Sequence, residues 1–190
     1  MKKAMYVAVL LSFFMVSCGG GTQYLDATKD AGSMEFGPRE IKVTVTKMVA
    51  SMYDFLKNEW KKSAYIQVKK FRNKTSEHID TKMISEEIAT NLIKKRIKFI
   101  DDNVTADALK EIEKGMTGMI DPTAAIPAGY MKSPNLYLTG DVRDNVRTVG
   151  SKRVQYLVVT LKLYNLKTRV VEWQDQQEFL KSTSKTKISF

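Results

Sequence analysis

The chain has little of the chemistry that metal sites and thiol enzymes depend on. It holds one cysteine, Cys18, and one histidine, His78, among 190 residues. A zinc site built from Cys and His ligands is therefore excluded, and so is a disulfide within the chain. The sequence also has no Gly-x-Ser-x-Gly motif and no glycine loop of the nucleotide-binding kind. We therefore expect a protein that is not an enzyme and that holds no metal ion or bound cofactor.

Long hydrophobic runs are equally scarce. One run of apolar and small residues, Ala4 to Val16, follows Lys2 and Lys3. It is shorter than the ~20 residues that a transmembrane helix needs, but it suits the core of a secretory signal peptide. Ser17, a small residue, comes directly before Cys18, and three glycines follow. No second segment is apolar over enough residues to cross a bilayer.

This arrangement resembles the lipobox of bacterial lipoproteins, in which the cysteine thiol receives a diacylglycerol and becomes the N-terminus after cleavage. Met15 departs from the pattern, since leucine is usual at that position. The resemblance implies a signal peptide over residues 1–17 and a covalent lipid on Cys18 that holds the protein at a membrane. More than one acyl chain on the cysteine is what stable anchoring requires. The alternative is an ordinary secretory signal that contains an incidental cysteine.

Positive charge predominates, with 31 Lys and Arg against 21 Asp and Glu and a net charge of +10. Loss of Lys2 and Lys3 with the signal peptide would leave a charge of about +8. A basic balance often marks nucleic-acid binding. An exported lipoprotein rarely meets nucleic acid, so we expect none as a partner. Anionic lipid head groups, peptidoglycan carboxylates or an acidic protein surface are the expected neighbours.

Residues 18–39 are predicted to form a flexible tether. The stretch "GGGTQYLDATKDAGSMEF" is rich in Gly, Thr, Asp and Ala and has no sustained periodicity. As a coil of roughly 22 residues it would reach about 25 Å, or at most ~75 Å when fully stretched. The remaining residues, 40–190, are enough for a single globular domain with its own core.

Hydrophobic periodicity predicts the elements of that domain. Apolar residues recur at helical spacing from Val45 to Phe55, whereas Ile66 and Val68 alternate with polar residues as in a strand. The expected elements are a helix over 41–61, a strand over 64–71, a helix from Asp80 or Thr81 to Lys95, a short strand over 97–101, a helix over 105–115, and strands over 136–142, 153–165 and 169–180.

This order predicts an α+β fold, a mixed β-sheet whose antiparallel C-terminal meander packs against amphipathic helices. The run at 153–165 is largely apolar at both alternate sets of positions, which predicts a central strand covered on part of both faces. Residues 116–134 contain three prolines and two glycines and are expected to form a long loop.

The order of elements, with particular residues at their turns, resembles the LpoB family of outer-membrane lipoproteins that activate penicillin-binding proteins. The matching residues are Asn73-Lys74-Thr75, Thr139-Gly140, Leu161, Leu166, Thr168 and Trp173. The resemblance covers roughly residues 40 to 180. One departure is Arg169, where the family commonly has glycine, so arginine is strained if that position needs a positive φ. The other is the tether, which lacks the long proline-rich linker of enterobacterial members.

The resemblance implies an outer-membrane lipoprotein that faces the periplasm, where it binds and stimulates a bifunctional penicillin-binding protein and so regulates peptidoglycan synthesis. We expect it to be a monomer. No motif fixes the docking residues, and the turn "RNKTSEH" and the loop at 116–134 are the candidates. Asn73 and Thr75 have the alternative role of closing the turn through side-chain hydrogen bonds. Within the turn we single out Arg72, Asn73, Lys74, Thr75 and His78.

Two other functional classes compete with this one. The carboxylate pairs Glu86-Glu87 and Asp101-Asp102 suggest catalysis only weakly, because neighbours in a helix do not share a face. The main alternative is a non-catalytic structural or assembly lipoprotein of another envelope or secretion machine, with a CsgG-related core. The chain lacks the length for the two extra membrane-inserting hairpins of CsgG-type proteins.

A positive patch is expected if the first helix and the first strand pack together. The alternative is a solvated basic face that keeps the domain soluble. The residues of this expected patch are Lys57, Lys61, Lys62, Lys69, Lys70 and Arg72.

Overall fold

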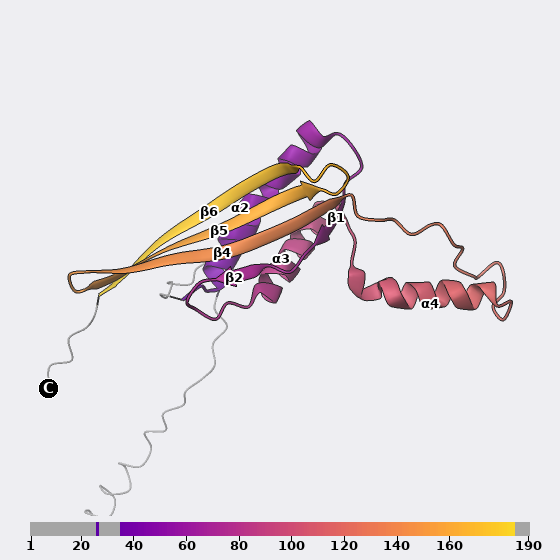
Figure 1. The fold of residues 1–190 in the computed structure, drawn as a ribbon, viewed down its shortest axis with the longest axis horizontal. Helices are drawn as coiled ribbons and strands as arrows, with labels where there is room; N and C mark the ends of the chain where they lie inside the picture. The colour runs from indigo at the N-terminus through magenta and orange to yellow at the C-terminus, as the bar shows by residue number, and fades with distance from the viewer. Residues whose placement is uncertain (1–25, 27–34, 185–190) are drawn as a thin grey trace, which may run out of the picture.

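The computed structural model describes residue 26 and residues 35–184. The predicted signal peptide, Cys18 and most of the predicted tether lie outside the described residues. Figure 1 shows a long twisted sheet with two helices on one face and a third helix that projects away from the sheet. Among the described residues, no helix has both the length and the apolar character that crossing a bilayer requires.

The elements follow the predicted order with shifted boundaries. The helices are α2 (Pro38–Phe55), the π-helical turn η2 (Leu56–Trp60), α3 (Thr81–Lys94), the 3₁₀ turn η3 (Asp102–Val104) and α4 (Thr105–Met116). The strands are β1 (Tyr65–Val68), β2 (Arg72–Lys74), β3 (Lys98–Phe99), β4 (Leu136–Val149), β5 (Lys152–Asn165) and β6 (Val171–Ser184).

The sheet is mixed, and its strands lie in the order β3-β1-β4-β5-β6. Strand β1 runs parallel to both β3 and β4, and β2 continues alongside β4 in the same parallel sense. Strands β4, β5 and β6 form an antiparallel meander. The predicted α+β fold with a mixed sheet and a C-terminal meander is therefore confirmed, and β5 is the central strand of that meander as expected.

One hydrophobic core joins the helices to the sheet. Alternate side chains of β4, β5 and β6 point toward the helices, as the period of two in a strand requires. The buried side chains are Val45, Met48, Val49 and Met52 from α2, Ile84, Ile88 and Leu92 from α3, and Leu138, Val142, Leu157, Val159, Leu161 and Leu163 from the sheet. Burying one such side chain is worth about 1.5–3 kcal/mol, so this face fixes the register of the meander.

Capping side chains set where the two core helices begin. Pro38 occupies the start of α2, where its fixed φ suits a helix, and the Glu40 carboxylate accepts a hydrogen bond from the Gly37 N–H at 2.9 Å. Asp80 caps α3 by accepting hydrogen bonds from the backbone N–H groups of Lys82 (2.9 Å) and Met83 (3.2 Å). Of the two caps predicted for this helix, the structure has Asp80.

The first helix of the core is seated on the last strand. The Trp173 indole N–H on β6 donates to the Ser51 hydroxyl on α2 at 3.3 Å. The Lys181 ammonium on β6 pairs with the Glu40 carboxylate on α2 at 3.0 Å, and both side chains are almost fully buried. The two ends of the described fold therefore hold each other in place.

Three expectations about the sheet are wrong in part. The turn predicted over residues 72–78 is wrong for its first three residues, which form β2. The strand predicted over 136–142 extends to Val149, because its polar second half pairs with β5. The second face of β5 carries the half-exposed Tyr156, and in the described part of the chain no helix packs on that face.

Gly140 on β4 lies where the sheet has no room for a side chain. A Cβ at this position would lie 2.7 Å from Leu161 Cδ2, 3.1 Å from the Thr160 carbonyl oxygen and 3.2 Å from Phe71 Cε1. Phe71 and Leu161 close over this glycine, so close packing accounts for glycine at the Thr139-Gly140 position.

Arg169 in the β5–β6 turn has a φ of 63°, in the left-handed region. Its N–H donates to the Asn165 carbonyl at 2.7 Å and closes the turn. The position where the family commonly has glycine therefore does require a positive φ, and arginine is strained there.

Candidate partner-binding surfaces

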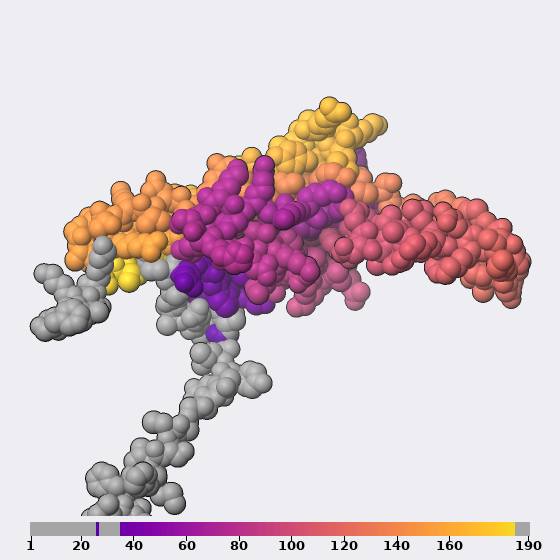
Figure 2. Space-filling model, turned by 60° about the horizontal axis from the view of Figure 1, so that its bottom comes forward, coloured from indigo at the N-terminus to yellow at the C-terminus, as the bar shows by residue number. Residues whose placement is uncertain are grey.

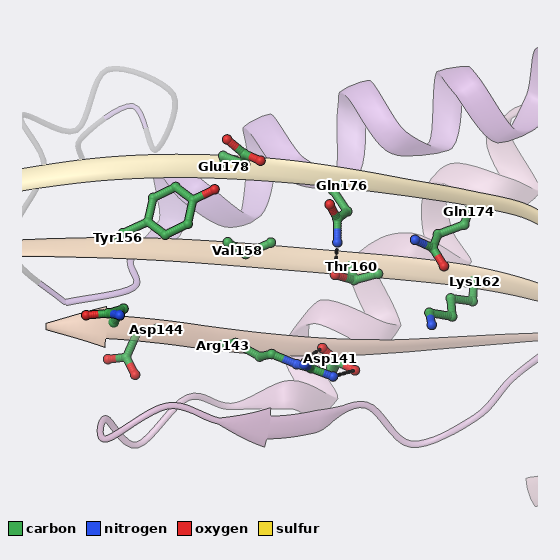
Figure 3. Close-up of a pocket in the computed structure, with 11 residues that line it drawn as sticks. Asp141, Arg143, Asp144, Tyr156, Val158, Thr160, Lys162, Gln174, Gln176 and Glu178 are labelled. Carbon is green, nitrogen blue, oxygen red and sulfur yellow. Dashed lines mark hydrogen bonds and ion pairs between the residues drawn. The ribbon is translucent and has the colours of Figure 1, made fainter.

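The face of the sheet opposite the helices carries a polar hollow. Its volume is about 480 Å³, and its lining comes from β4, β5 and β6 (Figure 3). The lining residues are mainly polar and charged, and those that the argument uses are Asp141, Arg143, Asp144, Tyr156, Gln176 and Glu178. Because this face has no second layer in the described part of the chain, its polar side chains are open to a partner.

The charges in this hollow are fixed by short contacts. The buried Asp141 carboxylate accepts from Arg143 Nε at 2.9 Å and Nη2 at 3.3 Å, and Lys74 Nζ lies 3.8 Å away. Across the sheet, a hydrogen bond to the Glu178 carboxylate raises the pKa of Tyr156 above its ordinary value, so the phenol stays protonated. The hollow therefore presents hydrogen-bond donors and acceptors in set positions.

A second surface is the projecting arm, which we define as residues 102–134. It comprises η3, α4 and the loop after α4, and Figure 2 shows it extending away from the body. Among the other helices and strands, α4 packs mainly against η3. The loop folds back on the end of α4, since a Cβ on Gly115 would lie 3.1 Å from the Ala125 Cβ. The arm therefore has its own small contact region and little attachment to the core.

The arm is unusually rich in exposed apolar side chains. It contains about a fifth of the described residues but seven of their fifteen exposed large hydrophobic side chains. Met119 is 89% exposed. The seven are Val104, Leu109, Met116, Met119, Ile126, Tyr130 and Met131. A concentration of exposed apolar groups on one segment is typical of a protein-binding surface.

Comparison with known proteins decides the family. A family model described as "Peptidoglycan-synthase activator LpoB" matches residues 40–179, which is most of the chain. The chain belongs to the LpoB family. Members of this family activate peptidoglycan synthases. No curated protein sequence shows a significant match to the chain.

The structure is also similar to solved structures of low sequence identity. The LpoB C-terminal domain from Salmonella enterica is 10% identical with a TM-score of 0.44, and the match covers 71% of this chain and 94% of that one. The LpoB C-terminal domain from Escherichia coli is 10% identical with a TM-score of 0.42, and the match covers 73% and 94%. Lipoprotein GNA1162 from Neisseria meningitidis is 16% identical with a TM-score of 0.41, and the match covers 65% and 88%.

In this LpoB-family chain, three of the five singled-out residues, Arg72 to Lys74, pair with β4, and Lys74 reaches Asp141 of the polar hollow. Arg72, Lys74 and His78 are exposed. Asn73 and Thr75 form hydrogen bonds that close the turn. The Asn73 side-chain carbonyl accepts from the Thr75 N–H at 2.9 Å and hydroxyl at 2.7 Å, and the Asn73 amide donates to the Glu77 carbonyl at 2.6 Å. The hydrogen bonds of the alternative role are therefore present, and the docking role of the five residues stays a prediction.

A buried glutamine ties this turn to the sheet. The Gln155 side-chain amide on β5 donates to the Glu77 carboxylate at 2.7 Å and to the Asp144 carboxylate at 3.0 Å. Ser76 also donates to Asp144, at 3.2 Å. Glu77 belongs to the turn and Asp144 to β4. A change in the turn would therefore alter the contacts of Asp144 at the edge of the hollow.

Residues of the two acidic pairs form ion pairs and a helix cap. Glu87 accepts from Lys42 Nζ at 2.7 Å, and this contact lowers the pKa of Glu87 below its ordinary value. Asp101 caps η3, and Asp102 pairs with Lys69 at 3.4 Å. Within the described residues, no three side chains of His, Cys, Asp or Glu come together in a way that could hold a metal ion.

Three residues of the expected basic patch, Lys57, Lys62 and Lys69, have different surroundings. Lys69 lies over the Tyr137 ring, 4.4 Å from its centre, and pairs with Asp102. Lys57 and Lys62 instead line a different hollow together with residues 95, 96 and 98, which follow α3. In the sequence, these cations belong to two separate basic stretches, near residues 57–62 and 94–98, each at the end of a helix.

Proposed function

We propose that this LpoB-family protein is an outer-membrane lipoprotein that faces the periplasm, anchored through Cys18, and that binds and stimulates a bifunctional penicillin-binding protein. The match of the family model to residues 40–179 carries this proposal, because it spans nearly all of the described fold. The lipobox-like sequence at Cys18 supports the anchor. The protein acts in this proposal by binding and not by catalysis.

The stimulation follows from differential affinity. A bound domain favours the active conformation of the synthase only to the extent that it binds this conformation more tightly than the inactive one. A lipid anchor replaces bulk concentration with a local concentration, which helps only while the tether can span the gap. The protein is proposed to act as a monomer, so one molecule carries the whole docking surface.

Two surfaces are the proposed points of docking. The first is the 72–78 segment with the adjoining polar hollow, where Arg72, Lys74 and His78 are exposed beside fixed charges. The second is the arm, where exposed methionines offer flexible apolar side chains that adapt to a partner. Asn73 and Thr75 are proposed to support the first surface, since their side chains form hydrogen bonds within the turn.

The direct test is glycan-strand synthesis by the organism's own bifunctional synthase, with and without the chain from residue 19 onward. We expect faster synthesis that saturates with added protein. Met116→Ser with Met119→Ser should weaken stimulation if the arm docks, and Arg72→Ser with His78→Ser should weaken it if the 72–78 segment docks. Met83→Ser is the matched control, because Met83 on α3 is 53% exposed and lies outside both surfaces.

An unchanged rate at a saturating amount of protein would refute the proposal. Crosslinking in intact cells followed by co-purification gives an independent answer. Recovery of another envelope machine without a penicillin-binding protein would favour the structural or assembly role with a CsgG-related core.

A further inference from the structure

A hollow lined by basic side chains lies where α2 with η2 and α3 come to an end. Its volume is about 360 Å³. Five of its ten lining residues are cations and none is an acid. The cations are Lys57, Lys62, Lys95, Arg96 and Lys98. We call this set of residues the basic hollow.

The positive charge of the basic hollow exceeds what the fold needs. None of its five cations forms an ion pair with an acidic side chain in the described part of the chain. Each helix C-terminus carries about half a negative charge, so two helix ends offset about one cation. In the described part of the chain, roughly four of the five positive charges are therefore offset neither by an acidic side chain nor by a helix end.

Aromatic rings hold three of these lysines in place. Lys95 Nζ lies 4.9 Å from the centre of the Tyr53 ring, Lys98 Nζ lies 4.9 Å from that of Tyr65, and Lys62 Nζ lies 5.4 Å from that of Trp60. A cation held over a ring keeps its charge and loses part of its conformational freedom before any ligand arrives. The hollow is therefore partly ordered for binding an anion.

One cation of the basic hollow, Arg96, occupies a strained backbone position. Arg96 has a φ of 61° in a turn where the Ile97 N–H donates to the Leu92 carbonyl at 3.0 Å, a pattern in which glycine is usual. Glycine would relieve the strain at this position, yet the chain places a positive charge there. Strain of this kind is found at sites where the side chain has a use.

We propose that the basic hollow is a binding site for phosphate groups. A phosphate group carries enough negative charge to pair with several cations at once. Both guanidinium and ammonium groups donate hydrogen bonds to its oxygens. The same chemistry is offered by free phosphate and pyrophosphate groups and by phospholipid head groups. The site lies on surfaces that the proposed docking on a synthase does not use, so the two proposals stand or fall separately.

The first test measures binding by calorimetry with the full chain in a neutral detergent. The probes are inorganic pyrophosphate and glycerophosphoglycerol, which is a phospholipid head group without its acyl chains. We expect saturable binding of at least one probe, and the tighter one identifies the source of the phosphate. Each cation contributes about five-fold, so Lys62→Gln with Lys95→Gln and Lys98→Gln should weaken binding roughly a hundred-fold.

A control variant separates a site from general attraction to a basic protein. Lys82→Gln, Lys132→Gln and Lys152→Gln remove the same charge from exposed positions outside the hollow, and this variant should bind like the unchanged protein. Equal weakening in the two triple variants would overturn the proposal, as would the lack of saturable binding of either probe.

The second test separates binding from stability. Arg96→Gly should raise the melting temperature, because it relieves the positive φ, and should weaken phosphate binding about five-fold. Arg169→Gly is the matched control, since it removes the same charge at a φ of 63° outside the hollow. It should raise the melting temperature and leave binding unchanged. If Arg96→Gly leaves binding unchanged as well, Arg96 has no part in the site and the proposal is refuted.

Discussion

The buried ion pair between α2 and β6 allows a sharp prediction about stability. Replacing Lys181 by methionine shortens the side chain by one atom, keeps most of its packing and removes its charge. The Glu40 carboxylate, with 6% of its side chain exposed, would then lose a cation that lies 3.0 Å away. Removing one partner of a buried pair leaves an uncompensated charge and costs about 3–5 kcal/mol.

The remaining contacts of Glu40 place the expected loss at the lower end of that range. Its carboxylate still accepts the hydrogen bond from the Gly37 N–H at 2.9 Å. Lys181 also donates to the Glu35 carbonyl, and that group can turn to solvent once the lysine is gone. We therefore expect Lys181→Met to lower the free energy of unfolding by about 3 kcal/mol, which corresponds to roughly 6–12 °C in Tm for a domain of this size.

The assay is urea denaturation of the chain from residue 19 onward, followed by circular dichroism. The control is the exposed pair Lys82–Glu86, whose side chains are 84% and 68% exposed and 3.7 Å apart. Lys82→Met should cost only about 0.3–0.5 kcal/mol. Adding Glu40→Gln to Lys181→Met should restore more than half of the loss, because glutamine keeps the cap and carries no charge. A loss below about 1 kcal/mol for Lys181→Met would refute the reasoning.

Three further predictions follow from single positions. Gly140→Ala should lower the free energy of unfolding by about 1–3 kcal/mol in urea melts, since its Cβ would meet backbone and a buried ring, and an unchanged midpoint would contradict the packing described. Asp80→Ala should cost about 1 kcal/mol through the lost cap of α3, whereas Asp80→Asn should cost little. The pKa of Glu87 is lowered by Lys42, so their pair stabilises the fold above the unfolded pKa of about 4.5 and this contribution is lost as pH falls through the lower folded value. Lys42→Met should therefore destabilise the protein at about pH 6 and have less effect at about pH 3, and a pH-independent difference would count against the pair.

The sequence predicts those parts of the fold whose pattern is decided by the core. Helix α3 is expected from Asp80 or Thr81 to Lys95 and extends from Thr81 to Lys94, because its cap and its apolar stripe are both local. The central position of β5 could be predicted for a similar reason, since its length and apolar content fit a strand with neighbours on both sides. At Arg169 the resemblance raises the question of a positive φ, because the family commonly has glycine there, and the structure answers it with a φ of 63°.

Other parts depend on partners far away in the chain. Strand β2 consists of three exposed polar residues, Arg72 to Lys74, and only its pairing with β4 makes it a strand. The second half of β4 is polar for the same reason and is held by its register with β5. No local pattern reports such pairing.

The grouping of cations in the basic hollow could not be predicted from the sequence either. The basic residues near 57–62 and those near 94–98 each look like the ordinary cations of a helix C-terminus. The excess becomes visible only when the two helix ends meet and the cations at both are counted together. The arm illustrates the same limit, since its helix was predicted but not its separation from the core.

The seating of α2 on β6 has a consequence for the order in which the molecule can be completed. During synthesis at about 5–20 residues per second, helix α2 leaves the ribosome roughly ten seconds before the strand that covers it. Throughout that interval the side chains of Met48 and Met52, which end fully buried, have no final neighbour on that side. In a nascent chain the apolar face of α2 is therefore exposed until β6 has been synthesised. A truncation that removes β6 would leave this face exposed permanently.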